Sequence, residues 1–196
     1  ERIVGVLPTI RQTLFFSVTM PKEIRRLADK FLLNPKEISV APPASPAENV
    51  EQGLVRCPGP DKRKALQGLL DRDQVQSGLI FCNRKRDVAA LAKALKKQGY
   101  SADELHGDMA QPVRTETLER FRNGDFALLV CSDVAARGLD IPAVSHVFNY
   151  DVPNHPEDYV HRIGRTGRAG RKGKSFTLAT PADGKALAGV EKMLKK

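Results

Sequence analysis

Short apolar runs alternate with helical patterns along most of the chain, and this alternation limits the fold more than any other feature. Residues 78–82 and 126–131 contain no charged or amide side chain, and a helical pattern over residues 84–98 follows the first of them. Strands that are apolar along their whole length are buried on both faces, and helical connections make successive strands parallel. We therefore expect an α/β fold, a parallel sheet with helices on both faces.

The same reading predicts where the remaining elements lie. The expected strands are residues 50–56, 78–82, 102–105, 126–131, 145–150 and 175–179. The expected helices are residues 61–70, 84–98, 112–123, 156–162 and 182–194. Gly99 and Gly124 follow two of these helices, at the position where a glycine commonly ends a helix. In a parallel sheet, the loops after the carboxyl ends of the strands carry the chemistry.

The first part of the chain has a different organisation. Residues 12–16 and 37–40 are strand candidates, and Pro21 opens a helix through about Leu33 with an apolar face. Residues 41–47 read APPASPA, whose three prolines and lack of large apolar side chains predict a semi-extended linker. The chain therefore divides into residues 1–40, a linker, and a regular α/β domain.

The charge balance favours a polyanionic partner. The net charge is +9 and the isoelectric point is near 9.6. Nucleic acid is favoured over a membrane, because no basic amphipathic anchor and no apolar run of about 20 residues occur. Aromatic residues make up 6% of the chain and tryptophan is absent, which argues against base stacking as the main binding mode.

The cysteines indicate a reducing compartment. Cys57, Cys82 and Cys131 are odd in number and lack the spacing of metal ligands, and two of them end apolar runs. We expect buried, reduced thiols, no bound metal, and a cytoplasmic protein.

The strongest chemical signal is the run HRIGRTGR at residues 161–168. Its arginines lie three positions apart, at Arg162, Arg165 and Arg168, and residues 159–174 contain no acidic side chain. Guanidinium groups bind phosphate oxygens in forked pairs of hydrogen bonds, and the intervening glycines allow a close approach. The alternative is a solvated basic turn. This order of His, Arg and Gly resembles the sixth conserved motif of DEAD-box RNA helicases.

The resemblance covers the whole chain. Residues 1–40 resemble the last strands and helix of the first RecA-like helicase domain, residues 41–47 the interdomain linker, and residues 48–196 the second RecA-like domain. It favours a bacterial member, of the RhlE type. The fold that it implies is a RecA-like α/β sheet.

The sixth motif implies contacts with ATP. Arg165 and Arg168 match the pair that contacts the ATP phosphates, and Arg168 matches the arginine finger. Fixed positive charge of this kind is worth about 10³–10⁵ in rate in phosphoryl transfer. His161 matches a residue that bridges to the first lobe, although a lone histidine on a helix is usually structural.

Residues 132–140 resemble the fifth motif. The resemblance places RNA phosphate at Ser132 and Asp133, and the ATP ribose at Asp140. Gly138 would let the backbone pass close to the nucleotide. The alternative for Asp140 is a helix or turn cap.

Two further segments resemble RNA-binding or apolar motifs. Within residues 106–114, the resemblance implies that Gly107 and Arg114 contact the RNA backbone; the alternative for Arg114 is an ion pair with Glu116 or Asp108. Residues 79–83 resemble the fourth motif, to which we assign no chemistry.

Four residues are implied to couple the two lobes. Ser17 and Thr19 lie in a tripeptide that resembles the third motif, and Arg137 lies in the segment that resembles the fifth. Arg162 is expected to support the loop of the sixth motif by pairing within the chain. Val18 stands where the family has alanine, and its extra volume in a packed junction can cost about 1–3 kcal/mol.

Neither a Gly-x-x-x-x-Gly-Lys-Ser/Thr phosphate loop nor an Asp-Glu-Ala-Asp run occurs. The resemblance therefore implies ATP with Mg²⁺ in the full-length enzyme, no tightly bound cofactor here, and no ATP hydrolysis by this chain alone. The expected partners are RNA and the first lobe, with dimerisation through residues 1–40 as a further expectation. The alternatives are a non-catalytic RNA-binding module and a lobe of a superfamily 2 DNA helicase.

Overall fold

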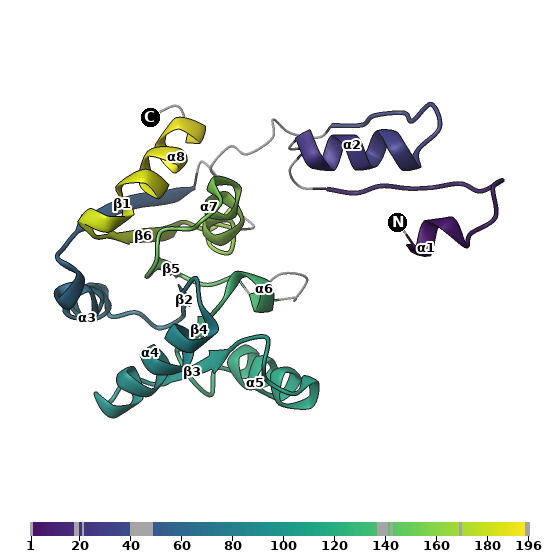
Figure 1. Cartoon of the computed structure of the whole chain (residues 1–196). Coiled ribbons are helices and arrows are strands. Elements are labelled where there is room, and N and C mark those ends of the chain that lie inside the picture. The colour runs from purple at the N-terminus through teal and green to yellow at the C-terminus, as the bar shows by residue number, and fades with distance from the viewer. Residues whose placement is uncertain are drawn as a thin grey trace. The chain divides into compact units, whose positions relative to one another are not determined.

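The structure is a computed structural model, shown in Figure 1. It describes residues 2–17, 20, 22–39, 49–136, 141, 143–168 and 170–194. The chain divides into two compact units, Glu1–Ser45 and Pro46–Lys196.

The second unit is built on a parallel sheet of six strands in the order β1-β6-β5-β2-β4-β3. The strands are β1 Val50–Arg56, β2 Gly78–Phe81, β3 Ala102–Leu105, β4 Leu128–Cys131, β5 His146–Asn149 and β6 Gly173–Ala179. The predicted parallel α/β sheet is confirmed. Because every strand runs in the same direction, all the carboxyl ends meet at one edge.

Helices cover both faces of this sheet (Figure 1). The helices of this unit are α3 Lys62–Asp73, α4 Lys85–Lys97, α5 Gln111–Asn123, α6 Asp133–Ala136, α7 Pro156–Ile163 and α8 Gly184–Leu194. In β2, Ile80 packs with α3 and α4, whereas Leu79 and Phe81 pack with α5 and α6. This alternation explains why the strand is apolar along its whole length.

The ends of the elements follow local backbone chemistry. Gly99 and Gly124 have φ angles of 88° and 80°, so the predicted glycine ends of α4 and α5 are confirmed. The predicted strand over residues 126–131 begins later, at Leu128, and Phe126 before it packs on Phe121 at a ring-centroid distance of 5.3 Å. The sequence gives no signal for α6, whose four residues are too short to show a helical period.

The first unit contains α1 Arg2–Gly5 and α2 Lys22–Phe31. The predicted strand over residues 12–16 is not formed, and residues 37–39 are also outside any strand. A strand needs a hydrogen-bonding neighbour, and none is paired with these segments in the described part of the unit. Residue 40 lies outside the described residues.

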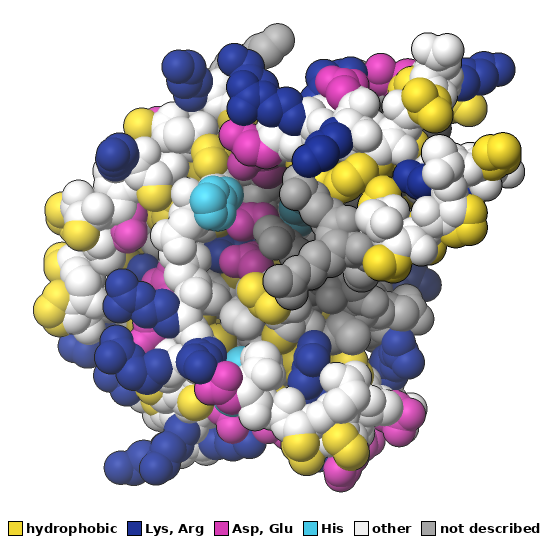
Figure 2. All heavy atoms as spheres, turned by 45° about the vertical axis from the view of Figure 1, so that its right-hand side comes forward, with side chains coloured by type: hydrophobic (Ala, Val, Ile, Leu, Met, Phe, Trp, Pro, Cys, Tyr) yellow, Lys and Arg dark blue, Asp and Glu magenta, His cyan; other side chains and the backbone are white. Residues whose placement is uncertain are grey.

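Apolar side chains lie at the surface of this first unit, as Figure 2 shows at upper right. The most exposed are Val6, Ile10, Phe16 and Leu33, at 83%, 97%, 88% and 92%. No residue of α2 is fully buried.

A buried arginine joins the carboxyl ends of the central strands. Arg162 in α7 is 1% exposed, and its Nε and Nη2 donate to the two carboxylate oxygens of Asp133 at 2.7 Å. Nη2 also donates to Asn83 Oδ1, and Nη1 to the backbone oxygen of Asp151, both at 2.7 Å. The guanidinium lies 5.3 Å from the ring centre of Phe81. A buried charge is tolerated only when it is paired and hydrogen-bonded in this way.

A second ionic cluster lies at the amino ends of the strands. The side chain of Asp73 is 6% exposed and accepts from Arg72 Nε at 2.7 Å and Lys174 Nζ at 3.2 Å. His146 Nε2 is 3.3 Å from the same carboxylate. Hydrogen bonds from Arg72 and Lys174 hold the pKa of Asp73 well below its usual value. Burial lowers the pKa of His146, which favours its neutral form.

Two of the three thiols are buried as expected. Cys82 and Cys131 are free and fully buried, and Cys57 is half-buried. Burial raises the pKa of Cys82 and raises the pKa of Cys131 to about 12, so both are neutral thiols. Within the described residues, no helix is long and apolar enough to cross a membrane.

We expect Arg162→Met to destabilise the chain by about 3–5 kcal/mol, because it leaves the Asp133 carboxylate and Asn83 Oδ1 without their buried donor. Urea unfolding measures this loss. Arg168→Met is the matched control: its side chain is exposed, and the cost is about 0.5 kcal/mol or less. Equal losses in the two variants would contradict the structural role of Arg162.

We expect Asp73→Asn to lower the unfolding free energy at pH 7 by about 1–3 kcal/mol, since it removes a buried acceptor of charged donors. The pKa of Asp73 is lower in the folded chain, so its contribution is present above the unfolded-state value of about 3.9 and is lost as the pH falls below it. The difference from the wild type should therefore shrink in acid, as urea titrations at several pH values would show. The exposed Asp125→Asn controls for a lost surface charge; a difference that stays constant with pH would refute the assignment.

Candidate functional site

Two predicted site segments of the second unit lie at the carboxyl edge of the sheet, the edge at which open parallel sheets bind their ligands. Gly107 follows β3, and Ser132 and Asp133 follow β4. Residues 164–168 follow α7, and we call them the arginine loop. The backbone of this loop runs beside Val144, Val50 and Gly173, at the amino ends of β5, β1 and β6.

The arginine loop is held on both sides of Arg165. The backbone N–H of Arg165 donates to Arg162 O at 3.1 Å, and its carbonyl accepts from Val144 N–H at 3.2 Å. Thr166 is 1% exposed and its hydroxyl donates to Val144 O at 2.5 Å. Gly167 has a φ angle of 68°, and a Cβ there would meet Val50 Cγ2 at 2.5 Å, so only glycine fits. These contacts fix the position of the Arg165 backbone, from which its side chain extends.

The two remaining arginines of the motif have different surroundings. Arg165 is half-buried, and burial, together with the charge of Arg168, lowers its pKa from the usual arginine value. Arg168 is exposed and its Nε donates to Gly164 O at 2.6 Å. Two guanidinium groups close enough to affect one another's charge form a site where a multivalent anion is favourable. The terminal phosphates of a nucleotide fit this pair by charge and by donor geometry.

His161 lies on α7 with its side chain 27% exposed, and its Nδ1 is 3.7 Å from Asp158 Oδ1. Its Nε2 is buried and has no hydrogen-bond partner among the described residues. A buried polar atom without a partner is costly, so a partner from outside this unit would stabilise it.

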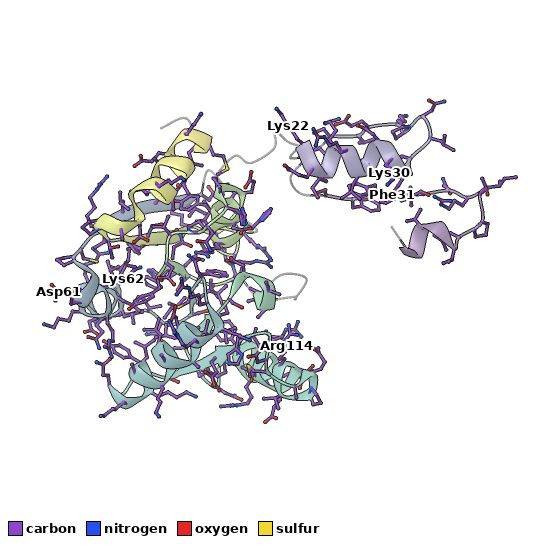
Figure 3. All side chains as sticks on the ribbon, viewed as in Figure 1. Lys22, Lys30, Phe31, Asp61, Lys62 and Arg114 are labelled. Carbon is purple, nitrogen blue, oxygen red and sulfur yellow. The ribbon has the colours of Figure 1, made fainter. Side chains whose placement is uncertain are left out.

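Arg114 lies in the first turn of α5, where Figure 3 labels it. Its Nη1 donates to Gln111 Oε1 at 3.1 Å and its Nη2 to Ala135 O at 3.5 Å. The alternative ion pair with Asp108 is not formed, because Lys85 Nζ lies 2.8 Å from that carboxylate. Arg114 Nε is buried without a partner in the described chain, which leaves donor capacity for a ligand.

Gly107 and Ser132 differ in exposure. Gly107 is exposed, and a Cβ built there would meet nothing within 4 Å. Packing within the chain therefore does not require this glycine, whereas close approach of a ligand backbone would. Ser132 is 8% exposed, and its backbone N–H donates to Leu105 O at 3.3 Å.

Asp133 has a role that the sequence did not reveal. Both of its carboxylate oxygens accept from Arg162. A carboxylate would also repel phosphate, so its side chain is committed to holding Arg162 rather than RNA.

Sequence reasoning also missed two acceptors of Arg162 and a lysine that pairs with one of them. Asn83 and Asp151 accept from it directly, and Lys62 Nζ donates to Asp151 Oδ1 at 2.9 Å. The available signal was that Asn83 and Asp151 each follow an apolar strand, where polar side chains meet at the sheet edge.

Several expected residues cannot be placed. Thr19, Val18, Arg137, Gly138 and Asp140 lie outside the described residues. Ser17 is described and exposed, but it belongs to the first unit.

No three His, Cys, Asp or Glu side chains in the described ranges are grouped so as to hold a metal ion.

Comparison with known proteins gives a consistent result. Residues 61–170 match the family model "Helicase conserved C-terminal domain". CshA, a DEAD-box ATP-dependent RNA helicase of Bacillus subtilis, is 42% identical over 196 residues, covering 100% of this chain and 40% of that protein. The RNA helicase CrhR of Synechocystis is 44% identical over 197 residues, again covering 100% of this chain and 40% of the relative. The chain thus spans about 40% of the length of these relatives, all of them bacterial.

Solved structures agree. The structure of S. cerevisiae Dbp5 bound to RNA and ADP BeF3 matches with a TM-score of 0.89 at 32% identity, over 98% of this chain and 51% of that one. E. coli SrmB bound to RraA matches with a TM-score of 0.69 at 38% identity, over 74% of this chain and 86% of that one.

These likenesses also confirm the expected RecA-like sheet. They do not test the finer RhlE assignment, which stays a prediction. The chain belongs to the DEAD-box RNA helicase family and contains its helicase C-terminal domain.

Proposed function

We propose that this chain is the second lobe of an ATP-dependent RNA helicase, and that it supplies Arg165 and Arg168 to the ATP phosphates across the cleft to the first lobe. The observation that carries this proposal is the arginine loop. Arg162 is buried and paired with Asp133, Asn83 and Asp151, while Arg168 of the arginine loop is exposed. The first arginine of the motif is thus structural, the second is half-buried and the third is exposed.

ATP with Mg²⁺, bound mainly by the first lobe, supplies the phosphoryl group that is transferred to water. Negative charge builds on that group as the reaction proceeds. Arg165 and Arg168 stabilise this charge through forked hydrogen bonds, and Arg168 acts as the arginine finger. Their half-buried and exposed positions let them reach a ligand without moving the sheet.

The RNA contacts lie along the loops at the carboxyl edge of the sheet. Arg114 retains a buried donor atom and sits beside α6, and Gly107 leaves room for a backbone to approach. Ser132 supplies a hydroxyl immediately before α6. Binding through the sugar-phosphate backbone makes affinity salt-dependent and nearly independent of sequence.

Coupling between the lobes completes the proposal. His161 presents an unpartnered buried nitrogen, and a first-lobe group would satisfy it. Ser17, Thr19 and Arg137 belong to the same coupling, while Asp140 and Gly138 bind the nucleotide at the fifth motif. Residues 1–40 are the end of the first domain, residues 41–47 the linker, and residues 48–196 the second domain of a cytoplasmic enzyme. The apolar surface of residues 1–40 then packs on the rest of the first domain, or pairs two copies when that domain is absent.

We expect RNA-stimulated ATP hydrolysis only when the chain is mixed with a separately produced first lobe, because the chain has no phosphate loop of its own. Arg168→Ala should lower the rate of the mixture by about 10³-fold or more, and Arg168→Lys should restore only part of it. Phosphate release with and without RNA measures both effects.

The controls separate this function from its alternatives. Arg171→Ala removes a nearby exposed charge and should leave the rate within about twofold. Hydrolysis by the chain alone would contradict the proposal. An inactive mixture that still binds RNA would favour a non-catalytic module, and stimulation by DNA rather than RNA would favour a DNA helicase lobe.

We expect Arg114→Gln to weaken single-stranded RNA binding equally for unrelated sequences. It should also reduce the slope of log affinity against log salt by about 0.7, the value for one lost phosphate contact. Fluorescence anisotropy across a salt series measures this slope. The exposed Arg122→Gln on the same helix is the control, and an identical change there would refute a specific contact at Arg114.

A further inference from the structure

We propose that Lys62 is a positioning residue for the arginine loop, acting through Asp151 and Asn83 on Arg162. This inference rests on the proposed function, because it concerns how the phosphate-binding arginines are held. None of the motifs named above contains Lys62, which lies at the start of α3.

Lys62 is buried in a position where a lysine is costly. The residue is 8% exposed, and in Figure 3 it lies on the sheet side of Asp61. Its Nζ is 2.9 Å from Asp151 Oδ1, 3.8 Å from Asp183 Oδ2 and 5.1 Å from the ring centre of Tyr150. Lysine is almost never fully buried unless it is paired. Its charge is therefore directed to the carboxyl end of β5 rather than to solvent.

Asp151 passes this constraint to Asn83. While Oδ1 of Asp151 accepts from Lys62, its Oδ2 accepts from the backbone N–H of Asn83 at 3.0 Å. The amide nitrogen of Asn83 donates to Val152 O at 2.8 Å, which turns its Oδ1 towards Arg162. The Asp151 carboxylate is thus held from both sides, and it fixes the backbone of Asn83 beside Arg162.

Both residues are acceptors of Arg162. Its Nη1 donates to the backbone oxygen of Asp151 and its Nη2 to Asn83 Oδ1, each at 2.7 Å. Arg162 in turn holds Asp133 at the start of α6, and its carbonyl accepts from the N–H of Arg165 at 3.1 Å. Removing the charge of Lys62 takes away the ion pair that holds the Asp151 side chain. The two acceptors of Arg162, Asp151 O and Asn83 Oδ1, then become less firmly positioned.

A purely structural role for Lys62 makes a different prediction. Loss of stability alone would lower the unfolding free energy and leave the environment of Arg162 unchanged in molecules that remain folded. If Lys62 positions Arg162, its substitution changes the environment of Arg162 in molecules that remain folded. The Nε–H of Arg162 reports it directly, since this proton is buried against Asp133.

The test is the ¹⁵N–¹H spectrum of the arginine Nε–H groups in the full 196-residue chain, with the Arg162 signal assigned from Arg162→Lys. Lys62→Met should shift or broaden that signal and the backbone amide of Arg165, and Lys62→Arg should restore both. Lys64→Met is the matched control, because its side chain is 83% exposed. If Lys62→Met unfolds the chain, Lys62→Gln replaces it, since it keeps a donor but no charge.

An Arg162 signal that is unchanged in Lys62→Met, or equally changed in Lys64→Met, would overturn the proposal. Failure of Lys62→Arg to restore the signal would also count against it.

The rate of ATP hydrolysis provides a second test of the role of Lys62. In the mixture with the first lobe, Lys62→Met should lower RNA-stimulated ATP hydrolysis by roughly 2- to 30-fold, the range for residues that act through a network. Its effect should not add to that of Asn83→Ala, because both act through one contact. If the unsubstituted chain mixed with the first lobe is inactive, that result counts against the proposed function alone. The arginine Nε–H spectra would still show whether Lys62 positions Arg162.

Discussion

The buried guanidinium of Arg162 is the interaction on which the functional edge depends. Four of its hydrogen bonds, each 2.7 Å long, join α7 to groups that follow β2, β4 and β5. The sheet brings these loops to one edge, but it does not orient their side chains. Because a buried charge is stable only with all its partners in place, this arginine allows one arrangement of the loops. Lysine could not replace it, since one ammonium group lacks the planar fork.

The spacing of the motif follows from this division of roles. Arg162 lies on the inner face of α7, which ends at Ile163, so Arg165 and Arg168 fall in the loop beyond the helix end. Thr166 fixes the middle of that loop to Val144, and Gly167 lets it pass Val50. Burial therefore decreases from the first arginine to the third. A ligand meets charges that the chain has already positioned, which reduces the reorganisation that binding requires.

Much of this was predictable from local sequence. The apolar runs predicted the strands, and the glycines after α4 and α5 predicted their ends, because both depend on neighbouring residues alone. The strand predicted over residues 12–16 was wrong, since pairing needs a neighbour that local sequence does not show. The contacts of Lys62, Asn83 and Asp133 were missed for a related reason. Each joins residues 29 to 89 positions apart, and spacing along the chain carries no signal for them.

The most direct test of the central claim is a crystal structure of this chain with the first lobe, single-stranded RNA and ADP with beryllium fluoride in place of the terminal phosphate. The account predicts guanidinium nitrogens of Arg165 and Arg168 within about 2.7–3.2 Å of the phosphate or fluoride, with Arg162 still paired to Asp133. An Arg168 side chain that remains in solvent, or an Arg162 that leaves Asp133 to reach the nucleotide, would contradict it.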